Sequence, residues 1–67
     1  MMENPLNNGC KPNEHYGITK AAQLLGVTRP TIYRYIKLGD LKVHLHKKLQ
    51  SQRIMGTDII KFYNSIS

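Results

Sequence analysis

The sequence feature that most constrains the fold is a turn signal between two short helical segments. Gly26 follows the largely apolar run 21–25, where a helix commonly ends on a residue in the left-handed conformation that glycine adopts without steric cost. Thr28 and Pro30 follow closely, and a threonine before a helix and a proline in its first turn are typical of a helix start. The pattern therefore predicts two helices joined by a tight turn.

The two predicted helices have definite bounds. We expect the first over about 20–25, with Thr19 as its N-cap, and the second over about 29–38, with Thr28 as its N-cap. Ala22 is small enough to lie where two short helices cross steeply. These spacings favour a helix-turn-helix, although an ordinary corner between two helices would show them as well.

A β-hairpin is predicted after the second helix. Apolar and polar residues alternate from Leu41 to His46, which is the period of a strand with one buried face. A mainly polar stretch follows, and Arg53-Ile54-Met55 has the character of a short return strand. We expect the apolar face of this hairpin to lie against the helices, leaving its cationic residues outward.

A third helix is predicted near the end of the sequence. Residues 56–58 form a cap sequence, and apolar side chains then recur on one helical face at Ile59, Phe62 and Ile66. Residues 1–17 have no hydrophobic period, so we expect a flexible or irregular N-terminal arm before one folded domain over 18–67. The predicted fold class is a small α+β winged helix-turn-helix: a helix-turn-helix, a two-stranded β-hairpin wing and a C-terminal helix.

Length and composition argue against several classes of protein. A chain of 67 residues has apolar residues for one core and few left to line a catalytic pocket, so we do not expect an enzyme. Cys10 is the only cysteine, so no internal disulfide can form, which fits a reducing cytoplasm. No apolar run approaches the roughly 20 residues that cross a bilayer, and residues 1–12 lack the apolar segment of a signal peptide. We therefore expect a cytoplasmic protein with no membrane partner.

The formal net charge of +6 belongs to the part of the chain that is predicted to fold. Residues 19–67 hold nine lysines and arginines against two aspartates. Such an excess can serve solubility alone, but a polyanionic partner explains it better, because each neutralised phosphate releases a counterion. Nucleic acid is therefore the expected partner.

The outer face of the second predicted helix has the composition of a helix that lies in the major groove of DNA. Arginine pairs with guanine O6 and N7, threonine bonds base edges or phosphates, and this face carries no acidic residue. Arg29 and Arg34 are the candidates for base readout, whereas Tyr33 has aromatic packing as an alternative role. The candidate DNA-contacting residues on this helix are Thr28, Arg29, Thr31, Tyr33, Arg34 and Lys37.

Two further groups of residues are candidates for contact with the DNA backbone. A wing beside a groove helix can cross the adjacent minor groove or its phosphates, and its candidate residues here are Lys42, His44, His46, Lys47, Lys48 and Arg53. Thr19 and Lys20 are candidates at the start of the first helix. His44 and His46 share one side of a strand, but no third or fourth ligand is evident, so we expect no metal site and no cofactor.

One long run of spaced residues gives the chain a family likeness. The run is Ile18-Thr19-x-x-Ala22-x-x-Leu25-Gly26-Val27-Thr28-Arg29-x-Thr31-Ile32-Tyr33-Arg34-x-Ile36-Lys37-x-Gly39-x-Leu41, followed by Arg53-Ile54 and Asp58-Ile59-x-x-Phe62. Over roughly residues 18–62 the sequence resembles the excisionase-type helix-turn-helix family, a branch of the MerR-like winged helices. The resemblance implies DNA binding through the second helix and the wing, with Arg53 on the return strand and a groove-facing segment that holds Thr28, Arg29, Thr31, Tyr33 and Arg34.

The resemblance also implies a biological role. Members of this family include recombination directionality factors of phages and mobile elements, and small transcriptional regulators. We expect an excisionase that binds and bends double-stranded DNA for a tyrosine recombinase (integrase), beside neighbouring copies of itself and without a small-molecule effector. A small phage or plasmid transcriptional regulator, and the DNA-recognition domain of a phage terminase small subunit, stay open as alternatives.

Overall fold

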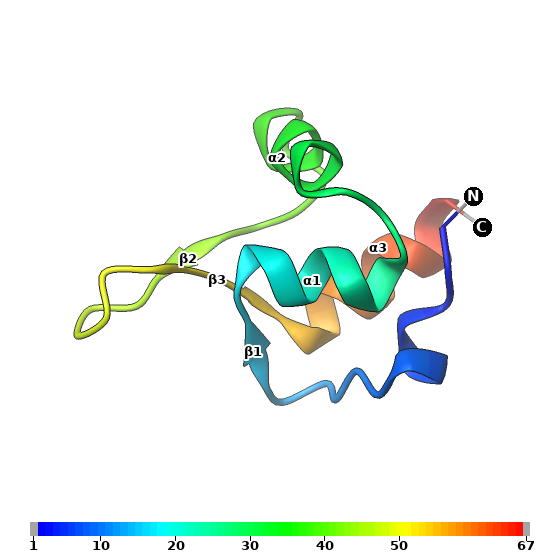
Figure 1. Ribbon diagram of the computed structural model, residues 1–67, viewed down its shortest axis with the longest axis horizontal. Helices are drawn as coiled ribbons and strands as arrows, with labels where there is room; N and C mark the ends of the chain where they lie inside the picture. The colour runs from blue at the N-terminus through cyan, green and yellow to red at the C-terminus, as the bar shows by residue number, and fades with distance from the viewer. Residues whose placement is uncertain (1, 67) are drawn as a thin grey trace.

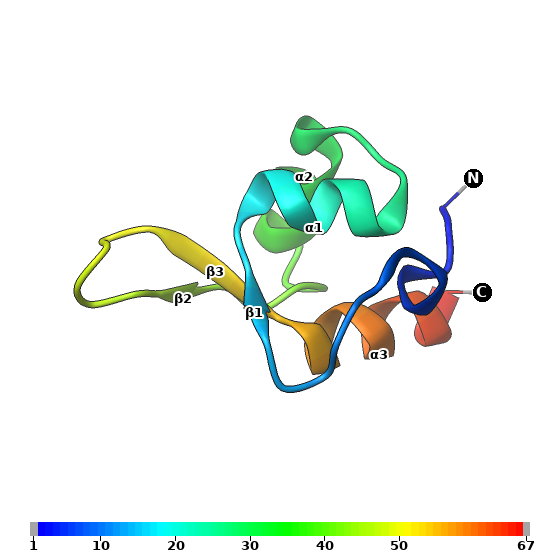
Figure 2. The same cartoon turned by 60° about the horizontal axis from the view of Figure 1, so that its bottom comes forward.

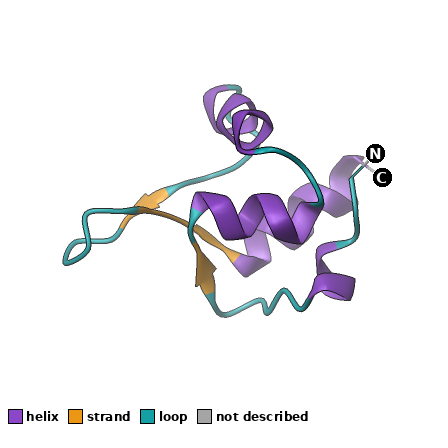
Figure 3. Ribbon diagram, viewed as in Figure 1, coloured by secondary structure: helices purple, strands orange, loops and turns teal. Residues whose placement is uncertain are grey.

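Helices and short strands follow one another along residues 2–66, which the computed structural model describes (Figure 1). In chain order they are the 3₁₀-helix η1 (Pro5–Asn8), β1 (His15–Tyr16), α1 (Ile18–Leu25), α2 (Arg29–Lys37), β2 (His44–Leu45), β3 (Gln52–Met55) and α3 (Gly56–Ile66). Figure 3 shows the same elements by type, with the hairpin β2–β3 projecting away from the helices. The predicted order of helix, turn, helix, hairpin and helix is confirmed, and two elements precede it.

The turn between α1 and α2 is the one that the sequence predicts. Gly26 has a φ of 67°, in the left-handed region, and its N–H donates to the Gln23 carbonyl at 3.2 Å. The Val27 N–H donates further back, to the Ala22 carbonyl at 2.9 Å. These two bonds satisfy carbonyls that the last turn of α1 would otherwise leave without partners. The chain reverses there and enters α2.

The start of α1 differs from its prediction. Thr19 lies inside the helix, and the N-cap is Gly17, which has no side chain to donate or accept a capping bond. The reason is that β1 ends at Tyr16 and brings an extended backbone directly to Gly17. Thr28 is the N-cap of α2, as predicted, but its hydroxyl lies 3.1 Å from the Thr31 hydroxyl and makes no capping bond to the backbone.

The strands form one antiparallel sheet in the order β1-β3-β2. Tyr16 of β1 lies opposite Ile54 of β3, and His44 of β2 lies opposite Arg53. The predicted hairpin is present, but the expectation of only two strands is wrong, because β1 comes from the segment that was expected to be irregular. Leu45 of β2 is 67% exposed, since the hairpin projects past the helices (Figures 1 and 2). The prediction that the apolar face of the hairpin packs against the helices is therefore wrong for Leu45.

The segment before α1 packs on the rest of the domain. The Glu3 N–H donates to the Leu25 carbonyl at 2.8 Å, and the Asn8 side-chain amide donates to the Leu24 carbonyl at 2.9 Å. Figure 2 shows this segment running alongside α3. The sequence predicts a flexible or irregular arm here, because hydrogen bonds from backbone and amide groups do not require apolar residues at regular spacing. The buried side chains among residues 2–17 are Pro5, Cys10 and Tyr16.

The core lies where α1, α2, β3 and α3 meet. Its largest fully buried apolar side chains on these elements are Leu24, Leu25, Ile32, Ile54 and Ile59. Phe62 of α3 packs against Tyr35 of α2, with ring centroids 4.6 Å apart. Ile66 was predicted on the packed face of α3 but is 51% exposed, because the last turn of the helix runs beyond the core. The apolar stripe of α3 is thus buried at Ile59 and Phe62.

Gly56 is the point at which the N-terminal segment meets α3. Its N–H donates to the Glu14 carbonyl at 2.7 Å, and its own carbonyl lies 3.8 Å from Cys10 Sγ. A Cβ at this position would overlap the carbonyl oxygen of Lys11, so a residue without a side chain is required. Burial raises the pKa of the Cys10 thiol, which keeps the thiol in its unreactive protonated form.

Gly56→Ala is expected to lower the free energy of unfolding by about 1–3 kcal/mol, the usual cost of forcing extra atoms into a packed site. Thermal unfolding followed by circular dichroism measures the effect. Gly17→Ala is the matched control, because a Cβ there would lie 3.5 Å from Arg53 Nη1, an ordinary contact distance. Equal melting temperatures for the two variants would contradict the close packing at Gly56.

Candidate nucleic-acid interface

The structure places the predicted outer face of α2 in solvent. Ile32 is fully buried against the core, whereas the candidate residues on the other side of the helix are open. Thr31 is half-buried, and the exposed candidates are Thr28, Arg29, Tyr33, Arg34 and Lys37. The helix carries no acidic residue, so its outer face is uniformly cationic or neutral. This face has the charge and the accessibility that a major-groove helix needs.

The two tyrosines of α2 have different surroundings. Tyr35 is half-buried and packs against Phe62, with the two rings tilted by 58°. Tyr33 is 44% exposed, so its ring and hydroxyl are available to a partner. The structure therefore separates one tyrosine that holds α2 to α3 from one that belongs to the outer surface.

A cleft of about 270 Å³ brings together parts of all three predicted contact groups. Arg29 and Tyr33 enter it from α2, Thr19 enters it from the start of α1, and Arg53 enters it from β3. The other lining residues are Gly17, Ile18, Ser51 and Gln52, and none of the eight is acidic. We call this the interhelix cleft. It joins the helix-turn-helix to the hairpin as one continuous surface.

The Arg53 side chain is held in place within this cleft. Its Nε donates to the Ser51 hydroxyl at 3.2 Å, and the residue is half-buried. Its guanidinium passes close to Gly17, where any side chain larger than hydrogen would come into contact with it. An arginine restrained in this way loses less side-chain entropy when it binds an anion. Arg53 is thus a cation of the hairpin whose side chain is restrained by a hydrogen bond and by partial burial.

The tip of the hairpin is built around His46 and not around a glycine. The His46 N–H donates to the Ser51 carbonyl at 2.9 Å, and the His46 Nδ1 accepts from the Leu49 N–H at 3.2 Å. Gln50 takes a φ of 49°, the left-handed conformation that a glycine would usually supply in such a turn. The half-buried His46 ring therefore helps to form the turn. Four other candidates on the hairpin side of the molecule are exposed: Lys42, His44, Lys47 and Lys48.

Some residues of this surface were not predicted, and one candidate lies apart from it. Lys20 is exposed on α1 but does not line the interhelix cleft, unlike its neighbour Thr19. Ser51 was missed, although its place just before Arg53 makes it a natural partner for the guanidinium. His15 was missed as well; it does not line the interhelix cleft, and the β1–β3 pairing brings its ring to 6.3 Å from that of His46. The strand β1 is only two residues long, so it shows no alternation of apolar and polar residues from which His15 could have been predicted.

Residues 2–66 hold neither a metal-binding cluster nor a membrane-spanning helix. No group of three or more histidine, cysteine, aspartate or glutamate side chains is arranged so that it could hold a metal ion. None of the described helices combines the length and the apolar character that crossing a membrane requires.

A comparison with protein families agrees with this geometry. The model of a helix-turn-helix domain matches residues 16–66, which span α1, α2, the hairpin and α3. Domains of this class bind DNA, and double-stranded DNA is the partner that the match supports. No curated protein matches the chain, and no solved structure does.

Proposed function

We propose that this chain, which belongs to the helix-turn-helix domain family, binds specific sequences of double-stranded DNA through α2 and the hairpin β2–β3. The observation that carries the proposal is the interhelix cleft, where Arg29 and Tyr33 of α2 lie beside Arg53 of β3. A duplex that accepts α2 in its major groove meets the cations of the hairpin at the adjacent backbone or minor groove.

The candidate residues on the outer face of α2 divide into two roles. Arg29 and Arg34 have the planar guanidinium that pairs with guanine O6 and N7, so they read sequence. The hydroxyls of Thr28 and Thr31, 3.1 Å apart in the first turn, bond phosphates and set the register of the helix in the groove. Lys37, in the last turn of α2, neutralises the DNA backbone.

Affinity for a duplex is expected to fall steeply with salt, because each phosphate neutralised releases condensed counterions. Lys47→Ala combined with Lys48→Ala should weaken binding to all duplexes alike and make the slope of log affinity against log salt shallower by about two. Fluorescence anisotropy with a labelled duplex measures both effects. The control pair, Lys11→Ala with Lys61→Ala, removes the same charge elsewhere. An unchanged slope in the hairpin variant would mean that the tip does not touch DNA.

Arg34→Ala is expected to cost about 1–3 kcal/mol of binding free energy at its cognate base pair and to relax the preference at that position. The physical reason is the loss of a bidentate contact to one base. Selection of preferred sites from a random duplex pool, followed by affinity measurements on single-base variants, gives the readout. Lys61→Ala, which removes one exposed charge from α3, should keep the preference. A uniform loss of affinity over all sequences would instead assign Arg34 to the backbone.

We further propose that the protein is an excisionase, which shapes DNA for a tyrosine recombinase beside neighbouring copies of itself. Its resemblance to excisionase-type domains supports this role. So does the continuity of the cationic surface from α2 through the interhelix cleft to the hairpin, since cations gathered on one side of a duplex favour bending toward that side. The role requires no pocket for an effector.

Saturating a duplex that carries one binding site should bend it by about 20–90°, the range seen when proteins act on the minor groove. Energy transfer between dyes at the two ends of the duplex reports the bend. The variant with Lys47→Ala and Lys48→Ala, at a concentration that restores saturation, should bend the duplex less. A saturated complex with the transfer efficiency of free DNA would favour a small transcriptional regulator over an excisionase.

A further inference from the structure

The two faces of the sheet have different surroundings. Tyr16 and Ile54 are opposite each other on β1 and β3, and both are buried against the core. Successive residues of a strand point to opposite faces, so the adjacent pair, His15 and Met55, lies on the outer face. His44 of β2 lies on this outer face too, through its pairing with β3.

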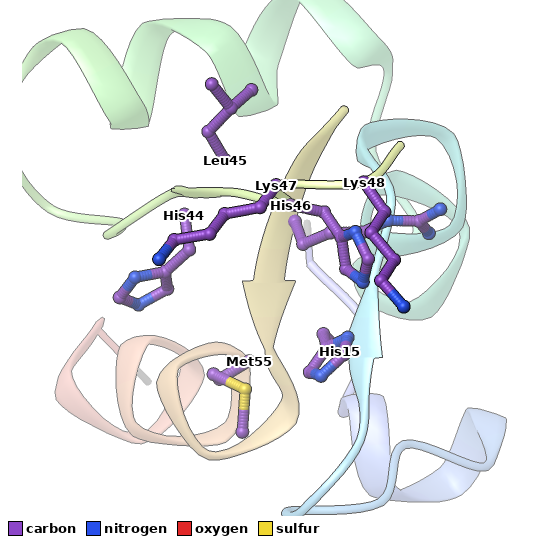
Figure 4. A pocket seen from close by; sticks show the side chains of 8 residues that line it. His15, His44, Leu45, His46, Lys47, Lys48 and Met55 are labelled. Atoms are coloured by element: carbon purple, nitrogen blue, oxygen red, sulfur yellow. The ribbon is translucent and has the colours of Figure 1, made fainter. Parts of the chain in front are cut away.

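The outer face of the sheet carries a groove of about 670 Å³, which we call the sheet groove (Figure 4). Half-buried Met55 supplies an apolar surface inside it, and the groove is also lined by the rings of His15 and His46, which are 6.3 Å from each other. Lys47 and Lys48 extend along the rim (Figure 4). None of the lining residues in the described part of the chain is acidic. The groove therefore offers an apolar surface bordered by cations and imidazoles.

This combination selects a ligand with two kinds of group. Carboxylates suit the cationic rim, and an apolar side chain suits Met55, whose flexible thioether adapts to different shapes. The volume lies within the range of sites that take small ligands or a few side chains. We propose that the sheet groove docks an extended segment of a partner protein that carries acidic and apolar side chains.

The groove overlaps the surface that we assign to DNA, but only in part. His44, His46, Lys47, Lys48 and Arg53 are candidates for DNA contact and also line the groove, whereas His15, Leu45 and Met55 belong to the groove alone. The interhelix cleft is lined by Gln52, which shares the inner face of β3 with Ile54, whereas the sheet groove is lined by Met55 of the outer face. Arg53 lines both, and its bond to Ser51 restrains its Nε. A sugar-phosphate backbone would gain nothing from the Met55 surface, so the charge and the apolar lining together favour a peptide over a second duplex.

The experiment uses a short synthetic peptide in which glutamate and leucine alternate, titrated into the isotope-labelled protein and followed by amide chemical shifts. The expected result is saturable shifts at His15, His46 and Met55 in the free protein, and weaker peptide binding in the protein saturated with its DNA site, because Lys47 and Lys48 of the rim are shared with the duplex. The same peptide with glutamine in place of glutamate should bind at least about fivefold more weakly, because it lacks the charge.

Two variants test the site itself. His15→Glu places a negative charge in the groove, and Met55→Gln removes the apolar surface; each should weaken peptide binding by about fivefold or more and leave duplex affinity unchanged. Asn13→Glu adds the same charge at an exposed position outside the groove and should have little effect.

Three outcomes would overturn the proposal. The first is the absence of saturable shifts. The second is displacement of the peptide by the duplex together with loss of duplex affinity in His15→Glu, which would assign the groove to DNA. The third is equal binding of the glutamate and glutamine peptides. None of these outcomes affects the assignment of α2, so the proposed function and this inference fail separately.

Discussion

The antiparallel pairing of β1 with β3 is the contact on which the rest of the molecule depends. It is only two residues long on the β1 side, yet it buries Tyr16 against Ile54 and sets the point at which α1 begins. Because α1 begins at that point, α2 is placed so that Arg29 lies in the same cleft as Arg53. The outer side of the same pairing carries His15 to the edge of the hairpin. One short ladder thus positions both cationic surfaces.

The distribution of charge gives these surfaces their character. Acidic residues are few in the sequence and do not line the interhelix cleft or the sheet groove among residues 2–66. The two surfaces differ in the uncharged side chains that accompany their cations. The cleft combines guanidiniums with hydroxyls and an exposed tyrosine, groups that suit phosphates and base edges, whereas the groove combines lysines with imidazoles and a thioether. Both surfaces are cationic, but their uncharged residues suit different ligands: DNA for the interhelix cleft and a peptide for the sheet groove.

The parts of the fold that could be predicted from the sequence are those determined by local hydrogen bonds. The turn at Gly26 and the outer face of α2 follow from neighbours within one or two helical turns, and the structure has both. The sequence could not reveal β1, because a two-residue strand has no measurable period and takes its stability from a partner far along the chain. Nor could it show that Gln50 would take the place of a turn glycine, or that Leu45 would stay exposed. These positions depend on where the hairpin lies relative to the helices.

The contact between Lys11 and Gly56 has a consequence for the way in which the domain folds. It joins the segment before α1 to the start of α3, so the two parts of the core most distant in sequence are in direct contact. Forming such a contact requires the closure of a long loop, whose entropy must be lost before the contact contributes any stability. A chain emerging from the ribosome can form α1, the turn and α2 early, but it cannot complete this core until α3 has emerged. The packing of α1 and α2 against the sheet and the N-terminal segment is therefore complete only after α3 has emerged.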